Sequence, residues 1–260
     1  MQSAPLNANE RMPPAEPPRP VALITGAARR VGATIARALH AAGYDLALHY
    51  RHSLADVQAL CADLDAARAG STLPIAAELV DVEALPGIVE KCISRFGRLD
   101  ALVNNASTFF PTPIGKVTAA QWDDLFASNA RAPLFLAQAA APHLRAAHGA
   151  IVNLVDIYAQ RPLPGHPVYC MAKAALAMMT LALAKELAPE VRVNGVAPGA
   201  VLWPESGKAY ADQTELIART PLQRAGAPED VAGTVLFLLR DAKFTTGQIL
   251  NVDGGRSLAI

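Results

Sequence analysis

The chain has 260 residues, of which 52% are hydrophobic and 18% charged, and its 23 lysines and arginines balance 23 aspartates and glutamates. This length allows one large domain or two small ones, and the even charge excludes a global basic field for nucleic acid or an anionic membrane. Three cysteines without CxxC spacing fit reduced thiols in the cytoplasm. No continuous apolar run reaches the roughly 18 residues of a membrane-spanning helix, so a cytoplasmic protein is expected.

The N-terminal segment is rich in proline. Five prolines lie between Arg11 and Val21, and no apolar signal core accompanies them. This composition predicts a disordered tail over residues 1–19 and not a targeting peptide. Residues 20–260 are then expected to form one folded domain, whose regular structure begins at Val21.

From Val21 onward, short apolar runs alternate with segments of helical spacing. Strands are expected at residues 21–25, 45–50, 73–79, 99–106, 150–156, 191–199 and 247–255. Helices are expected between them, the first three at residues 31–43, 54–70 and 82–97, with Pro86 in the first turn of the third. Strands that are apolar almost throughout and alternate with helices are typical of a parallel sheet covered on both faces. The sequence therefore predicts an α/β fold with seven parallel strands, and its function is expected at their carboxyl ends.

The first expected strand leads into the segment TGAARRVG, residues 25–32. A segment that follows a strand and opens a helix has the context of a phosphate-binding turn. Gly26 lets the chain turn sharply and Gly32 lets the helix approach the strand, while Arg30 replaces the middle glycine of the usual pattern. Taken alone, the segment could also be a purely structural turn.

The second expected strand is followed directly by Arg51, His52 and Ser53. Enzymes that bind NAD usually place an acidic residue here for the adenosine ribose, and this chain has none. A cation and two hydrogen-bond donors suit a 2′-phosphate, and Arg30 offers a second guanidinium. The segment therefore favours NADPH as the cofactor, although arginine is also common in solvated loops.

Tyr169 and Lys173 form a Tyr-x-x-x-Lys pair. Four residues are about one turn of a helix, so the two side chains share a face. A lysine next to a tyrosine favours the phenolate and lets the hydroxyl give up a proton near neutral pH. Thirteen residues upstream, where many such enzymes have serine, this chain has Asp156.

Four segments together resemble the short-chain dehydrogenase/reductase family: TGAARRVG, NNAS at residues 104–107, Asn129, and YCMAK at residues 169–173. The resemblance covers residues 21 to about 257. It implies a single Rossmann-fold domain with a doubly wound parallel sheet and helices on both faces, assembled as a homotetramer. It also implies a catalytic relay of Asn129, Tyr169 and Lys173, to which Asp156 is added here.

The resemblance and the strand ends together assign the cofactor contacts. They are Gly26, Arg30, Val31, Gly32, Arg51, His52, Ser53, Glu78, Leu79, Asn105, Ala106, Ser107, Tyr169, Lys173, Pro198 and Gly199. The acid that usually meets the adenine corresponds to Glu78, with Asp81 as a nearby alternative and the Leu79 amide as a further contact. No metal site is expected.

Three departures from the ordinary family pattern resemble its pteridine reductase branch: Arg30, Ser107 and Asp156. The resemblance implies that a pterin contacts Arg30, Ser107, Asp156 and Tyr169 and stacks on Phe109. Residues 202–220 would form a substrate lid.

An ionised Asp156 would repel the oxyanion of a reduced ketone, because a carboxylate only accepts hydrogen bonds. A reduced C=N instead leaves a nitrogen that needs a proton, which a carboxyl group can route or supply.

Two other functions stay open from the sequence. The first is a general reductase of the same family that acts on a ketone or an acyl-carrier substrate, against which Asp156 argues. The second is an NADPH-binding regulator without turnover, against which the complete set of Asn129, Tyr169 and Lys173 argues.

Overall fold

The computed structural model describes residues 18–201 and 213–259. Most of the predicted tail and residues 202–212 of the predicted lid therefore lie outside the described residues. Seven parallel strands form one sheet in the order β3-β2-β1-β4-β5-β6-β7. They are β1 (Val21–Ile24), β2 (Asp45–Tyr50), β3 (Thr72–Ala76), β4 (Ala101–Asn104), β5 (Ala150–Leu154), β6 (Arg192–Pro198) and β7 (Ile249–Val252). The predicted single-domain Rossmann fold is confirmed.

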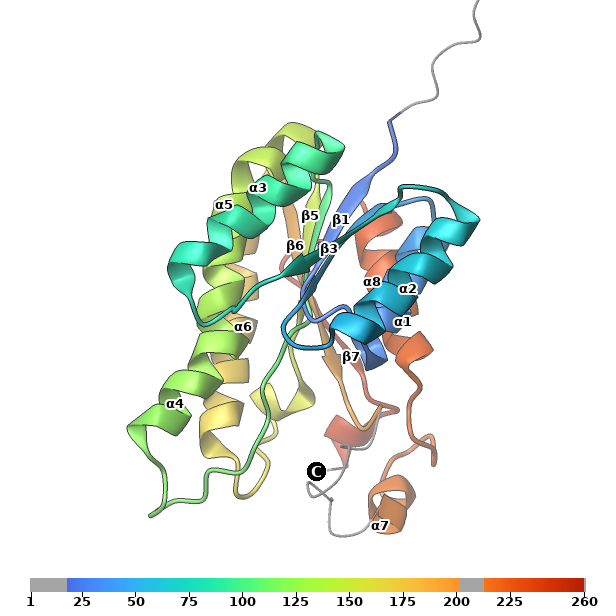
Figure 1. Cartoon of the computed structure of the whole chain (residues 1–260). Helices are drawn as coiled ribbons and strands as arrows, with labels where there is room; N and C mark the ends of the chain where they lie inside the picture. Colours follow the sequence, from blue (N-terminus) through green and yellow to red (C-terminus); the bar gives the residue numbers. More distant parts are fainter. Residues whose placement is uncertain (1–17, 202–212, 260) are drawn as a thin grey trace, which may run out of the picture.

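Helices cover both faces of the sheet (Figure 1). The helices are α1 (Arg30–Ala41), α2 (Leu54–Ala67), α3 (Leu85–Phe96), α4 (Ala119–Phe126), α5 (Ala132–Ala147), α6 (Pro167–Glu186), α7 (Gln213–Ala218) and α8 (Pro228–Arg240). Helices α1, α2 and α8 lie on one side of the sheet, and α3, α5 and α6 lie on the other. Short 3-10 turns occur at Val82–Ala84, Ile157–Ala159 and Arg256–Leu258, and a π-helical segment occurs at Ala127–Arg131.

Strands β1, β2, β4, β5 and β6 each contribute to two hydrophobic cores, one on each face of the sheet. In β1, Ala22 and Ile24 pack into the core beneath α1 and α8, whereas Val21 and Leu23 pack into the core beneath α3 and α5. Successive side chains of a strand point to opposite faces, so a sheet buried on both faces requires apolar residues at every position. This requirement explains the continuous apolar runs in the sequence.

The strand order reverses between β1 and β4. In such sheets ligands bind outside the carboxyl ends of the strands at the point of reversal. The loops that follow β1, β2, β3 and β4 therefore meet where a ligand is expected.

Several predicted boundaries differ from the structure by a few residues, and two of them lie beside the site. The third strand was expected to run to residue 79 but ends at Ala76, because the following residues leave the sheet and line a cleft. The third helix was expected from residue 82, but the chain first makes a 3-10 turn and α3 begins at Leu85. Pro86 lies in its first turn, as predicted, where its missing N–H costs no hydrogen bond.

Among the described helices, α6 alone is long and apolar enough by composition to span a membrane. Its buried residues include Tyr169, Lys173 and Leu176, and it packs against the sheet in the core of the fold. A core helix of a folded domain passes the same length and hydropathy test.

Candidate active site

The turn between β1 and α1 has room for no side chain at its two glycines. Gly26 has φ +62°, and a Cβ there would lie 3.0 Å from the Cα of Ala106. A Cβ on Gly32 would lie 2.2 Å from the carbonyl oxygen of Gly26. The N-terminus of α1 therefore approaches the turn closely, which is the arrangement that binds a pyrophosphate with backbone N–H groups.

Arg30 takes the left-handed conformation that the middle glycine would favour, with φ 54°. The turn therefore holds a residue with a Cβ in a left-handed conformation, which costs backbone strain.

The turn is bonded to the segment that follows β4. The Thr25 hydroxyl accepts hydrogen bonds from the backbone N–H groups of Asn105 and Ala106 at 2.9 and 3.0 Å. The Asn105 amide in turn donates to the carbonyl oxygens of Thr25 and Gly26 at 2.8 and 3.0 Å. The two sides of the reversal point are thus fixed to each other.

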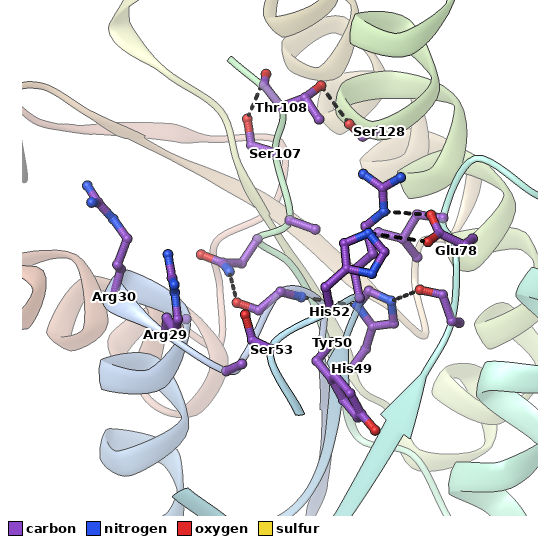
Figure 2. A pocket seen from close by; sticks show the side chains of 18 of the residues that line it. Arg29, Arg30, His49, Tyr50, His52, Ser53, Glu78, Ser107, Thr108 and Ser128 are labelled. Carbon is purple, nitrogen blue, oxygen red and sulfur yellow. Dashed lines mark hydrogen bonds and ion pairs between the residues drawn. The ribbon is translucent and has the colours of Figure 1, made fainter. Parts of the chain in front are cut away.

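A cleft of about 520 Å³ opens at these strand ends (Figure 2). The predicted cofactor residues in its lining are Gly26, Arg30, Val31, Gly32, Arg51, His52, Ser53, Glu78, Leu79, Asn105, Ala106 and Ser107. Tyr169, Lys173, Pro198 and Gly199 do not line it. Pro198 ends β6, and the Gly199 N–H donates to the Val252 carbonyl at 3.0 Å.

Sequence reasoning missed several residues of the cleft, among them Arg29 and His49. Arg29 and Arg30 lie on one side of the cleft and Glu78 on the other (Figure 2). A signal for His49 was available, because it is a polar residue that follows the apolar run Leu46–Leu48, two positions before Arg51.

Glu78 pairs with the residues predicted to hold the 2′-phosphate. Its carboxylate lies 2.6 Å from Nε of Arg51 and 3.8 Å from Nε2 of His52. The Glu78 side chain therefore joins the segment after β3 to the segment after the neighbouring strand β2. All three side chains are substantially exposed, so a bound anion can compete with Glu78 for Arg51.

Asp156, Tyr169 and Lys173 lie together at the carboxyl end of β5. The Tyr169 hydroxyl donates to Oδ2 of Asp156 at 2.7 Å, and Oδ1 accepts from the Tyr158 N–H at 2.9 Å. Nζ of Lys173 lies 5.8 Å from the centre of the Tyr169 ring and donates to the Leu154 carbonyl at 2.8 Å. The predicted residues are thus brought into one cluster.

Their surroundings shift two pKa values. Burial raises the pKa of the Asp156 carboxyl, while the hydrogen bonds from Tyr158 and Tyr169 and the charge of Lys173 oppose the shift. Burial lowers the pKa of Lys173 to about 8, against the attraction of Asp156. A carboxyl group that keeps a proton more readily and an ammonium that loses one more readily suit proton transfer near neutral pH.

The Asn129 side chain is buried and holds the segment after β4. Its amide nitrogen donates to the Thr108 and Leu125 carbonyls at 2.9 Å each, and its oxygen accepts from the Ser107 hydroxyl at 2.6 Å. Asn129 lies in the π-helical segment, and these hydrogen bonds reach neither Tyr169 nor Lys173. Its part in the relay stays a prediction.

Phe109 lies beside the cluster, between two rings. Its ring stacks on His166 with centroids 4.7 Å apart and planes at 6°, and meets Tyr169 edge to face at 4.8 Å. Such contacts hold an aromatic side chain in a fixed orientation. His166 was not singled out in the sequence, although it directly precedes the helix that carries Tyr169.

Comparison with known proteins places the chain in a family. A short-chain dehydrogenase/reductase model described as enoyl-(acyl carrier protein) reductase matches residues 26–257. The chain belongs to the short-chain dehydrogenase/reductase family. It is 39% identical to pteridine reductase 1 of Leishmania tarentolae, over 93% of this chain and 98% of that protein.

Relatives named for other substrates are nearly as similar. L-xylulose reductase of Bos taurus is 37% identical, over 90% of this chain and 95% of that protein. A 3-oxoacyl-(acyl-carrier-protein) reductase of Staphylococcus aureus is 34% identical, over 90% of this chain and 96% of that protein. The chain is therefore an oxidoreductase of a family whose reductases use NAD(P)H and small-molecule substrates. The glycine turn, the N-terminus of α1 and the basic residues of the cleft fit such a cofactor.

Proposed function

We propose that the chain is an NADPH-dependent pteridine reductase that reduces a dihydropterin to the tetrahydropterin. The observation that carries the proposal is the position of the Asp156 carboxylate, which accepts a hydrogen bond from the Tyr169 hydroxyl at 2.7 Å. A carbonyl reductase has a serine at this position. The 39% identity to a pteridine reductase supports it. A cytoplasmic location and a homotetramer belong to the same proposal.

The chemistry of a pterin explains the carboxyl group. A nicotinamide cofactor supplies the hydride when bound, and reduction of a ring C=N requires a proton on the nitrogen. Asp156 is partly exposed and its pKa is raised, so it can hold a proton or orient a water toward that nitrogen. Tyr169 and Lys173 supply a second proton donor beside it. One face of the Phe109 ring stacks on His166, so a planar heterocycle would stack on the other face or take the place of His166, with Ser107 and Arg30 as polar contacts.

The cofactor preference rests on the second strand end. Arg51 and His52 lie where an NAD enzyme would have an acid, and Ser53 follows them at the start of α2. Because Glu78 pairs with Arg51, a 2′-phosphate must replace this carboxylate as the partner of the guanidinium. A phosphate forms a stronger pair with arginine than one carboxylate oxygen does, which favours NADPH over NADH.

Substitution of Asp156 tests the substrate. We expect Asp156→Ala and Asp156→Asn to lower kcat for a 7,8-dihydropterin by about 10²- to 10⁴-fold, because neither side chain relays a proton. The affinity for the pterin should change little, since stacking on Phe109 survives. Asp156→Ser should give weak activity on activated ketones, and the exposed Asp56→Asn should leave both activities unchanged.

A general reductase of ketones or acyl-carrier substrates is the second candidate, because relatives with such names are 34% and 37% identical. Oxidation of NADPH by the wild type with a panel of dihydropterins, ketones and acyl thioesters separates the candidates. Turnover of ketones alone, or full dihydropterin activity of Asp156→Asn, would refute the pteridine assignment. An absence of turnover with NADPH bound would indicate a regulator.

A further inference from the structure

One buried titratable group in the cleft has no part in the proposed chemistry. His49 is 2% exposed and lies in β2 among apolar neighbours. Its Nδ1 accepts a hydrogen bond from the Gly26 N–H at 3.2 Å, and its Nε2 lies 3.2 Å from the Ala77 carbonyl oxygen. A buried histidine with two polar partners at a ligand cleft requires a physical explanation.

The two partners determine the state of the ring. A backbone N–H only donates and a carbonyl only accepts, so Nδ1 must carry a lone pair and Nε2 a hydrogen. His49 is therefore a neutral imidazole in one tautomer. Figure 2 shows the ring in this position, at the wall of the cleft.

The ring joins three strand ends that surround the cofactor cleft. Gly26 follows β1, His49 belongs to β2, and Ala77 follows β3. Backbone hydrogen bonds run alongside, from the Ala27 N–H to the His49 carbonyl at 2.9 Å and from the Ala77 N–H to the Tyr50 carbonyl at 3.2 Å. Strands β1 and β3 are not neighbours in the sheet, so the His49 side chain is a direct link between the glycine turn and the segment that carries Glu78.

We propose that His49 is a positioning residue for the dinucleotide: as a neutral imidazole it holds the Gly26 turn against the end of β3, so that cofactor binding requires His49 to be deprotonated. The proposal rests on the use of NAD(P)H in this cleft and does not depend on the pterin assignment. His49 acts through Gly26 and does not itself contact a substrate.

Protonation would break this link for a simple reason. An imidazolium has N–H groups at both nitrogens, so Nδ1–H would face the Gly26 N–H and one of them would have to move. Burial lowers the pKa of His49, and the Ala77 carbonyl and the Glu78 charge oppose the shift. Other charged groups in the lining are Arg29 and Arg30 of the turn, Arg51 and His52 after β2, and Asp124 of α4. The ring is therefore neutral at neutral pH, and the link is lost as the pH falls through its pKa.

Two substitutions separate the two hydrogen bonds. His49→Asn places an amide oxygen near the position of Nδ1, so it can still accept from Gly26 and cannot be protonated. His49→Gln reaches toward the position of Nε2, so it can donate to Ala77 but leaves the Gly26 N–H without its acceptor. His148→Asn is the matched control, because His148 is exposed, lies at the C-terminus of α5 and has a left-handed φ of 48° that asparagine tolerates.

The experiment measures the dissociation constant of NADP⁺ by calorimetry from about pH 5 to pH 8. At neutral pH we expect His49→Asn and His148→Asn to bind as the wild type does, and His49→Gln to bind about tenfold more weakly. As the pH falls, the wild type and His148→Asn should lose affinity more steeply than His49→Asn. The 2′-phosphate of NADP⁺ also titrates in this range, but the ligand is the same for all four proteins, so the difference belongs to His49.

The proposal would be overturned if the wild type and His49→Asn lost affinity for NADP⁺ equally as the pH falls. Binding of NADP⁺ by His49→Gln as tight as that of the wild type would also overturn it. Thermal unfolding without ligand shows whether each variant is folded. If either is not, ¹⁵N-histidine NMR of the wild type decides the matter. A neutral His49 with hydrogen on Nε2 in the NADP⁺ complex supports the proposal, and a charged ring or hydrogen on Nδ1 overturns it.

Discussion

At the scale of single residues, the backbone of Arg30 is the most informative feature of the site. Its φ of 54° is the left-handed conformation, which costs a residue with a Cβ about 1 kcal/mol. Glycine would remove this cost at a position where the usual family pattern has glycine. A side chain that is kept despite strain points to a function for the guanidinium, and the proposed pterin and phosphate contacts supply one.

Arg30→Gly should therefore stabilise the fold and weaken ligand binding. We expect the free energy of unfolding to rise by about 1 kcal/mol, while NADPH and dihydropterin bind more weakly by about tenfold. Thermal unfolding and calorimetry measure the two effects. His148→Gly relieves a similar left-handed backbone away from the cleft, so it should stabilise without changing affinity. If Arg30→Gly binds both ligands normally, the guanidinium has no role in either contact.

The proposed preference for NADPH rests on the residues that pair with Glu78. Replacement of Arg51 and His52 by alanine removes two of the proposed partners of the 2′-phosphate. We expect the KM for NADPH to rise about tenfold and the KM for NADH to change little, because only NADPH carries that phosphate. Arg37→Ala, which removes a surface pair with Asp63, is the control. An unchanged ratio of the two KM values would show that the 2′-phosphate lies elsewhere.

At the scale of helices and strands, the sequence predicted those features that depend on residues close together in the chain. The apolar strands, the TGAARRVG turn and the Tyr169–Lys173 pair were predictable, because sheet burial, a tight turn and one helical turn each constrain neighbouring residues. The pairing of Glu78 with Arg51 and the contact of His49 with Gly26 were not. Both depend on which side chains meet between different strands, and no spacing in the sequence encodes that distance.

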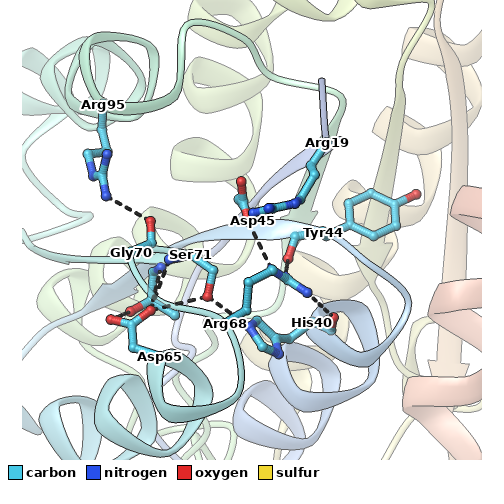
Figure 3. Close-up of polar contacts among 10 residues, drawn as sticks. Arg19, His40, Tyr44, Asp45, Asp65, Arg68, Gly70, Ser71 and Arg95 are labelled. Carbon is cyan, nitrogen blue, oxygen red and sulfur yellow. Dashed lines mark hydrogen bonds and ion pairs between the residues drawn. The ribbon is translucent and has the colours of Figure 1, made fainter. Parts of the chain in front are cut away.

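The end of the sheet opposite the site is fixed by its own polar network (Figure 3). Asp65 accepts hydrogen bonds from the backbone and hydroxyl groups of Ser71 and Thr72 at 2.9–3.1 Å. Arg68 donates to the carbonyl oxygens of His40 and Tyr44. These contacts join the ends of α1 and α2 to the starts of β2 and β3, so the cofactor loops extend from a rigid base.

Helix α6 should impose an alkaline limit on activity. The ammonium of Lys173 is lost as the pH rises through about 8, because burial lowers its pKa from the ordinary value. Since its charge favours the Tyr169 phenolate, the rate of reduction should fall above that pH. Lys173→Arg keeps a charge at higher pH, so its alkaline limb should shift upward even if its rate is lower. Lys185→Arg, at the exposed end of the same helix, should not move the limb. If the rate of Lys173→Arg still falls at about pH 8, the loss of activity is due to another group.

At the scale of the whole molecule, helices α4 and α6 expose apolar side chains. Met171, Met178 and Leu181 recur at helical spacing on α6 and are 43%, 63% and 43% exposed. On α4, Trp122 is 40% exposed and stacks on Phe126 with ring centroids 4.3 Å apart. Exposed apolar side chains that gather on neighbouring helices are typical of a protein–protein interface.

This surface lies on residues 119–144 and 168–187, and we expect the chain to assemble through them as a homotetramer near four times 27.3 kDa. Methionine adapts to an opposing surface and alanine allows close approach, so α6 can pack against its own copy. A charge buried in such a contact is costly. Met178→Glu should therefore yield assemblies smaller than the tetramer. Phe237→Glu on α8 is the control, because it leaves the α6 surface intact and should keep this contact. Size-exclusion chromatography with light scattering measures the mass of each protein. A wild-type peak at 27.3 kDa would refute the assembly, and a Met178→Glu tetramer with full thermal stability would place the contact on another face.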